Sequence, residues 1–92
     1  MTILEFWPDY GAGPLWSDGK PADLASLGLG EHLRSELTEW NARYEEDNLP
    51  LRGDGDAAWL SQGRDLLCQT RAALTPTYEV VVTEPWWVER PI

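Results

Sequence analysis

Short apolar segments at both ends of the chain predict β-strands. Residues 3–7, which read Ile-Leu-Glu-Phe-Trp, predict a strand that Pro8 ends. Glycine and proline in residues 9–14 predict a turn, after which residues 15–16 return as a very short strand. The valine-rich residues 78–83 predict the last strand.

Apolar residues at helical spacing predict two helices in the middle of the chain. The first helix is predicted over residues 30–46, on a stripe made by Leu33, Leu37, Trp40 and Tyr44. The second is predicted over residues 56–74, on a stripe made by Trp59, Gly63, Leu66, Leu67, Thr70 and Leu74. Asp54 or Asp56 is expected to cap the first turn of the second helix.

The order of these elements predicts an α+β fold of the form β-(β)-α-α-β. We expect two layers, with a small sheet of two or three strands packed on two helices, in a single domain over residues 1–92. If the first and last strands are neighbours in the sheet, we expect them to run parallel. Residues 85–92 form a tryptophan-rich C-terminal tail.

Both faces of the predicted sheet carry large apolar side chains. Leu4 and Phe6 point to one side of the first strand, and Ile3 and Trp7 point to the other. Two helices on one side cover only one face. Either the tail with Trp86 and Trp87 covers the open face, or a second chain does so, as in a homodimer.

The chain is strongly acidic, with sixteen Asp and Glu residues, seven Lys and Arg residues and a net charge of −9. Such a charge repels nucleic acid and anionic membrane and favours a basic protein partner. Residues 31–47 hold six acidic residues and two arginines, a net charge of −4. No apolar run reaches the roughly 20 residues of a membrane span. A lone cysteine, Cys68, is typical of a cytoplasmic protein.

The chemistry needed for catalysis or for metal binding is sparse. His32 and Cys68 are the only histidine and cysteine, too few for a zinc site, and they lie on different predicted helices. Asp54-Gly55-Asp56 resembles the start of a calcium loop, but position 12 is Asp65 within the second helix, where such a loop requires Glu. The sequence therefore predicts a protein that is not an enzyme and holds no metal or cofactor.

The six tryptophans fall into two groups. Trp40 and Trp59 lie on the helical stripes and are predicted to be core, and Trp7 is expected to pack as well. The other three, Trp16, Trp86 and Trp87, lie in loops or at the terminus. There a large aromatic ring either covers the core or anchors an interface, and both interpretations stay open.

The segment from Trp7 to Trp16, which reads Trp-Pro-Asp-Tyr-Gly-Ala-Gly-Pro-Leu-Trp, is distinctive. Together with Leu33, residues 40–45, Gly63-Arg64 and residues 78–80, it resembles a group of small acidic bacterial proteins of mostly uncharacterised function. Some of these are similar to immunity proteins of polymorphic or contact-dependent growth inhibition systems. The resemblance covers about residues 4–83, and it implies a shared fold and the neutralisation of a toxin.

A basic toxin cleft, such as that of a nuclease, would suit the acidic surface. We predict that the partner-binding residues are Glu39, Glu45, Glu46, Asp47, Asp9, Tyr10 and Trp16. The alternative is a homodimeric structural or adaptor protein, with Trp86 and Trp87 as dimer or tail contacts. A mimic of DNA that acts on a host enzyme is a further alternative.

Overall fold

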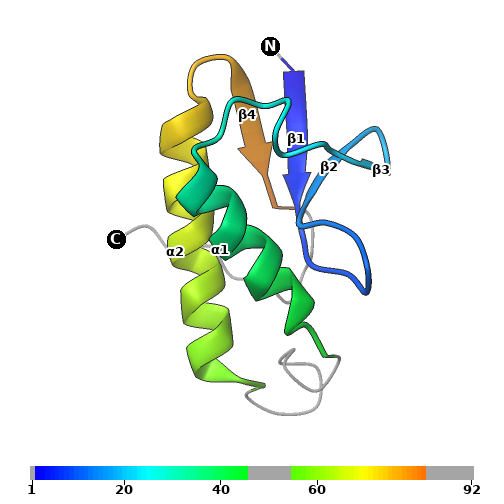
Figure 1. Ribbon diagram of the computed structural model, residues 1–92, viewed down its shortest axis with the longest axis vertical. Helices are drawn as coiled ribbons and strands as arrows, with labels where there is room; N and C mark the ends of the chain where they lie inside the picture. The colour runs from blue at the N-terminus through cyan, green and yellow to red at the C-terminus, as the bar shows by residue number, and fades with distance from the viewer. Residues whose placement is uncertain (1, 46–54, 83–92) are drawn as a thin grey trace.

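The computed structural model describes residues 2–45 and 55–82, which form two helices and a mixed four-stranded sheet (Figure 1). The α+β class predicted from the sequence is confirmed. In chain order the elements are β1 (Thr2–Phe6), β2 (Leu15–Ser17), β3 (Lys20–Pro21), α1 (Glu31–Ala42), α2 (Ala57–Leu74) and β4 (Tyr78–Val81).

The strands are ordered β3-β2-β1-β4 across the sheet. β1 and β4 are neighbours, and they run parallel as expected for that case, with Leu4 opposite Val80; β2 is antiparallel to β1 and to β3. The predicted number of two or three strands was wrong, because the turn after β2 is a hairpin. Asp18 and Gly19 both have positive φ, 52° and 76°, as a tight two-residue hairpin loop requires.

The first helix is shorter than predicted. α1 ends at Ala42 instead of residue 46, so Tyr44 and Glu45 follow the helix. The amides of Arg43 and Tyr44 bond to the carbonyls of Trp40 and Asn41, three residues back, and so tighten and end the last turn. At the start of α2, the Asp56 carboxylate accepts a hydrogen bond from the amide of Trp59 at 3.0 Å, which confirms the predicted cap.

The core lies between the helices and one face of the sheet. Leu4 and Phe6 of β1 and Val80 of β4 are buried, and both helices lie on that side of the sheet (Figure 1). Trp40 of α1 and Trp59 of α2 are buried beside them, as predicted. None of the described helices combines the length and apolar character needed to cross a membrane.

The opposite face of the sheet is covered in part by its own aromatic residues. Trp7 and Trp16 stack with their ring centroids 3.9 Å apart and an interplanar angle of 4°. Farther along β1, Ile3 is 54% exposed. Trp86 and Trp87, which were predicted as tail or dimer contacts, lie outside the described residues.

Candidate partner-binding surface

Five aromatic rings form a continuous series from the core to the surface. Phe6 and Trp40 have ring centroids 5.5 Å apart, and Trp40 and Trp59 stack at 4.4 Å. Tyr44 lies 6.0 Å from Trp59, and Tyr10 lies 4.8 Å from Tyr44. Tyr10 is 56% exposed, although the rings beneath it are buried or half-buried. The series therefore gives an exposed aromatic side chain rigid support.

The two helices are joined at the centre of this series by a reciprocal pair of hydrogen bonds. The indole N–H of Trp40 donates to the carbonyl of Trp59 at 2.8 Å, and the indole N–H of Trp59 donates to the carbonyl of Trp40 at 3.1 Å. Both indoles thus bury their rings while satisfying their single donor. The C-terminal end of α1 is consequently held against the N-terminal end of α2.

Asn41 holds the loop that carries Tyr10. Its Oδ1 accepts from the amide of Asp9 at 3.1 Å, and its Nδ2 donates to the carbonyls of Asp9 at 3.1 Å and Ala12 at 2.8 Å. Sequence reasoning missed this residue. The available signal was a polar side chain four residues after Leu37, on the apolar side of the helix.

The loop and the end of α1 bring acidic groups to the Tyr10 ring. The Tyr10 hydroxyl donates to Glu45 over a long distance of 3.5 Å, and the Asp9 carboxylate accepts from the Tyr10 amide at 2.8 Å. The last turn of α1 contains no basic residue, so the negative end of its dipole adds to these charges. Arg43 is the basic residue closest to Glu45 in the sequence, and its guanidinium donates to the side-chain oxygen of Gln62 at 2.6 Å.

The structure therefore brings together three of the predicted residues, Asp9, Tyr10 and Glu45, and we call them the Tyr10 surface. Trp16 is only 6% exposed, and its indole donates to the carbonyl of Trp7 at 2.8 Å. It covers the sheet and offers a partner little area. Glu39 is exposed on α1, where it borders a shallow hollow on the surface of that helix. Glu46 and Asp47 lie outside the described residues.

His32 and Cys68, the only histidine and cysteine of the sequence, lie on different helices. Among the described residues, no three His, Cys, Asp or Glu side chains gather as metal ligands. His32 pairs with Glu36 one turn along α1, and Cys68 is exposed on α2. The pKa of the Asp23 carboxyl is lowered by hydrogen bonds from the Ser26 hydroxyl and the Ala25 amide.

Comparison with known proteins assigns the chain to a family. A comparison with curated proteins gives no match. A family model described as Serratia CdiI immunity protein-like matches residues 2–85, which include every element of the sheet and both helices. The resemblance to immunity proteins seen in the sequence is thereby confirmed, and the chain belongs to the Serratia CdiI immunity protein-like family.

Proposed function

We propose that the protein is an immunity protein that binds a cognate growth-inhibition toxin and neutralises it by covering the toxin's cleft. The family match over residues 2–85 is the observation that carries this proposal. The protein performs no reaction of its own and requires no metal or cofactor. It acts in the cytoplasm, a compartment that suits its unpaired Cys68.

The partner is a basic protein, and a nuclease toxin fits best. A nuclease cleft must be positively charged to hold phosphate groups, and carboxylates can occupy the same positions. The Tyr10 surface offers two carboxylates beside an exposed aromatic ring, and the net charge of −9 attracts a basic cleft over long distances. Glu39, Glu46 and Asp47 extend this acidic surface in the proposal.

Tyr10 is proposed as the anchor of the interface. Residues that dominate binding are often Tyr, Trp or Arg side chains held rigidly before the partner arrives. Tyr10 is exposed, yet Tyr44 supports its ring and Asn41 holds its loop. Little conformational entropy is therefore lost when a partner covers it, and an arginine of the partner can stack on the ring beside the carboxylates.

The test uses the purified protein and the product of the gene immediately upstream. We expect Tyr10→Ala and Glu45→Lys each to weaken binding by at least about tenfold, because each removes a contact at the centre of the surface. Asp65→Lys is the matched control for Glu45→Lys, since it reverses an exposed carboxylate on α2 and changes the net charge equally. It should change the affinity by less than about threefold.

Two results would count against the proposal in different ways. If the upstream product does not bind the unaltered protein, the immunity function with this partner is wrong. If it binds and both substitutions at the Tyr10 surface behave like Asp65→Lys, the immunity function stands and the location of the surface is wrong.

A second candidate function is a homodimeric structural or adaptor protein. Its observation is Ile3, which is 54% exposed on the outer face of the sheet, where a second copy could cover it. Sedimentation of the protein at high concentration distinguishes the two candidates. A monomer that binds the upstream product excludes the homodimer.

A further inference from the structure

The two edges of the sheet differ in how they are protected. β3 is only two residues long, and it consists of an exposed lysine and an exposed proline, both of which discourage pairing with another strand. β4, at the other edge, is four residues long and contains Tyr, Glu and two Val residues. Its sequence favours a strand and contains neither Lys nor Pro, so Glu79 is its only residue of a kind that protects an edge.

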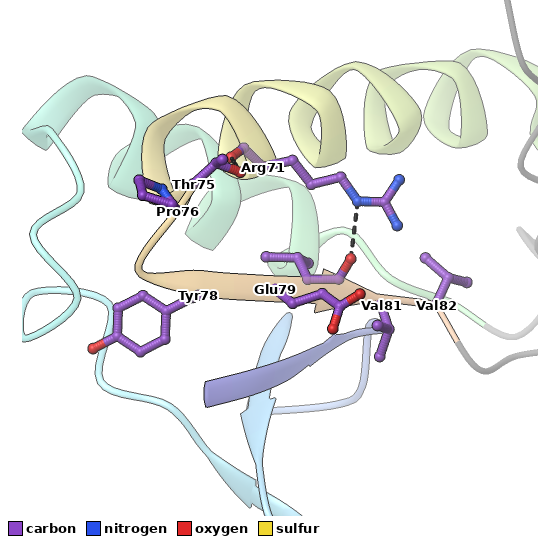
Figure 2. A pocket seen from close by; sticks show the side chains of 8 residues that line it. Arg71, Thr75, Pro76, Tyr78, Glu79, Val81 and Val82 are labelled. Carbon is purple, nitrogen blue, oxygen red and sulfur yellow. Dashed lines mark hydrogen bonds between the residues drawn. The ribbon is translucent and has the colours of Figure 1, made fainter. Parts of the chain in front are cut away.

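A groove of about 580 Å³ runs along the outer edge of β4 (Figure 2). It is lined by residues from the end of α2 and from β4: Arg71, Thr75, Pro76, Tyr78, Glu79, Val80, Val81 and Val82. In the groove, Nε of Arg71 donates to the carbonyl of Val80 at 2.9 Å (Figure 2). The carbonyl of Val80 therefore points away from β1 and into the groove.

The direction of that carbonyl identifies the other backbone groups on the open edge. The N–H and C=O groups of one residue point to the same side of a strand, and the side alternates along it. Tyr78 and Val82 therefore share the open side with Val80, while Glu79 and Val81 face β1. A strand that added at this edge would pair with the backbone of Tyr78, Val80 and Val82, and it would share or displace the Arg71 guanidinium at the Val80 carbonyl.

We propose that an extended segment of the partner adds to the outer edge of β4 as a fifth strand. The identity of the partner rests on the proposed immunity function, but the groove is a separate surface from the Tyr10 surface. Backbone pairing supplies the main contacts, and apolar side chains of the segment lie against Pro76 and Val82.

Two charged side chains line the groove. Arg71 bonds to the carbonyl of Val80, so Glu79 is the charge that would select the kind of segment. Glu79 is exposed on β4, and its carboxylate makes no hydrogen bond or ion pair with another described residue. A basic side chain on the added strand, opposite Glu79, would form a favourable cross-strand pair. A second copy of this chain is a poor occupant, because it would bring an equal charge of −9 and its own Glu79 to the same edge.

Amide hydrogen exchange of the full chain, alone and bound to the product of the gene immediately upstream, tests the added strand. We expect the amides of Tyr78, Val80 and Val82 to exchange at least about tenfold more slowly in the complex. The amide of Cys68, on the exposed side of α2, serves as the reference and should change much less.

Charge reversal supplies a second readout. Glu79→Lys should weaken binding roughly five- to tenfold, since it replaces a cross-strand attraction by a repulsion. Asp65→Lys again matches the change in net charge and should leave the affinity within about threefold. Because Glu79 is exposed, folding of the variant is expected to be unaffected, and far-ultraviolet circular dichroism checks this.

Three results would overturn the added strand while leaving the immunity function intact. In the first, the upstream product binds but exchange of the three amides does not change. In the second, these amides are already protected in the free chain and lose protection when residues 83–92 are deleted, so that the chain's own tail is the occupant. In the third, their protection rises with protein concentration, so that a second copy is the occupant. Failure of the upstream product to bind at all would instead overturn the proposed function.

Discussion

At the scale of single residues, buried polar groups show which side chains the fold uses. Asn41 is buried and makes three hydrogen bonds to the Tyr10 loop. Thr70 is completely buried on α2, and its hydroxyl has no hydrogen-bond partner among the described residues. Asn41 therefore holds the candidate site in place. The buried hydroxyl of Thr70 lowers the stability of the fold and makes no contact with that site.

Replacement of Thr70 should therefore stabilise the protein. Thr70→Val keeps the shape of the side chain and removes an unsatisfied hydroxyl, so we expect the free energy of unfolding to rise by about 1 kcal/mol. Chemical denaturation measures this change. Thr77→Val, at an exposed position, is the control and should have little effect. A loss of stability in Thr70→Val would show that the hydroxyl is satisfied in solution.

Ser26 controls the titration of Asp23. The Ser26 hydroxyl donates to the Asp23 carboxylate at 2.9 Å and is the largest cause of its lowered pKa, followed by the Ala25 amide at 3.1 Å. Ser26→Ala should therefore raise the pKa of Asp23 towards its ordinary value. Carbon NMR of the carboxyl group measures it, and Ser35→Ala on α1 should leave it unchanged. An unaltered pKa in Ser26→Ala would contradict this assignment.

The sign of the pH dependence follows from the direction of this shift. Because the pKa of Asp23 is lower in the folded protein than in the unfolded chain, its contribution to stability is present above the unfolded pKa. The contribution is lost as the pH falls through the folded pKa. Ser26→Ala should accordingly show a smaller loss of stability between those two pKa values.

At the scale of elements, the loop between β1 and β2 is shaped by close packing. Gly13 has a φ of 100°, and a Cβ at this position would lie 3.1 Å from the Trp16 ring and 3.1 Å from the carbonyl of Trp7. Gly11 also has a positive φ, 77°, but a Cβ there would meet nothing within 4 Å. Both glycines thus have a backbone φ that disfavours other residues, but only at Gly13 is there too little room for a Cβ atom.

Alanine substitutions at these glycines should separate the two effects. Gly11→Ala should destabilise the protein by about 1 kcal/mol, the cost of a positive φ for a residue with a Cβ. Gly13→Ala adds a steric clash with the stacked tryptophans and should cost at least about 1 kcal/mol more. Urea denaturation of both variants checks the difference. Equal losses would mean that the Trp7 and Trp16 stack shifts without cost.

At the scale of the whole molecule, net charge governs the approach of a basic partner. The charge of −9 creates an attractive field that salt screens, whereas the contacts of the Tyr10 surface act only after the partner has arrived. Long-range attraction mainly affects the association rate, and local contacts mainly affect the dissociation rate.

The rate of association with the upstream product should therefore depend on salt more strongly than the rate of dissociation. Raising the ionic strength from about 0.05 M to about 0.5 M should slow association by about tenfold or more and change dissociation much less. Stopped-flow mixing measures both rates. Lys20→Glu, which makes the exposed end of β3 more negative, should speed association. An association rate independent of salt would show that net charge does not guide the encounter.

Much of the fold could be predicted because local patterns specify it. The stripe of Leu33 and Leu37 locates α1, and Asp56 marks the beginning of α2. The four-stranded sheet was harder to predict, since β3 contains two residues and Pro21 is unusual in a strand. The Asp18-Gly19 pair was the local signal for that hairpin. The end of α1 was misplaced because the apolar spacing continues to Tyr44, which packs on the core from outside the helix.

By itself, the sequence determined the class of the fold, the buried tryptophan pair, the acidic character and the family resemblance, since these depend on spacing and composition. Only the tertiary structure decided which acidic residues meet. Asp9 and Glu45 are far apart in the chain and come together at Tyr10 because Asn41 bonds the loop to the end of α1. Only the tertiary structure also placed Trp16 in contact with Trp7 and left β4 at an edge. Contacts between distant segments depend on packing, which no local pattern specifies.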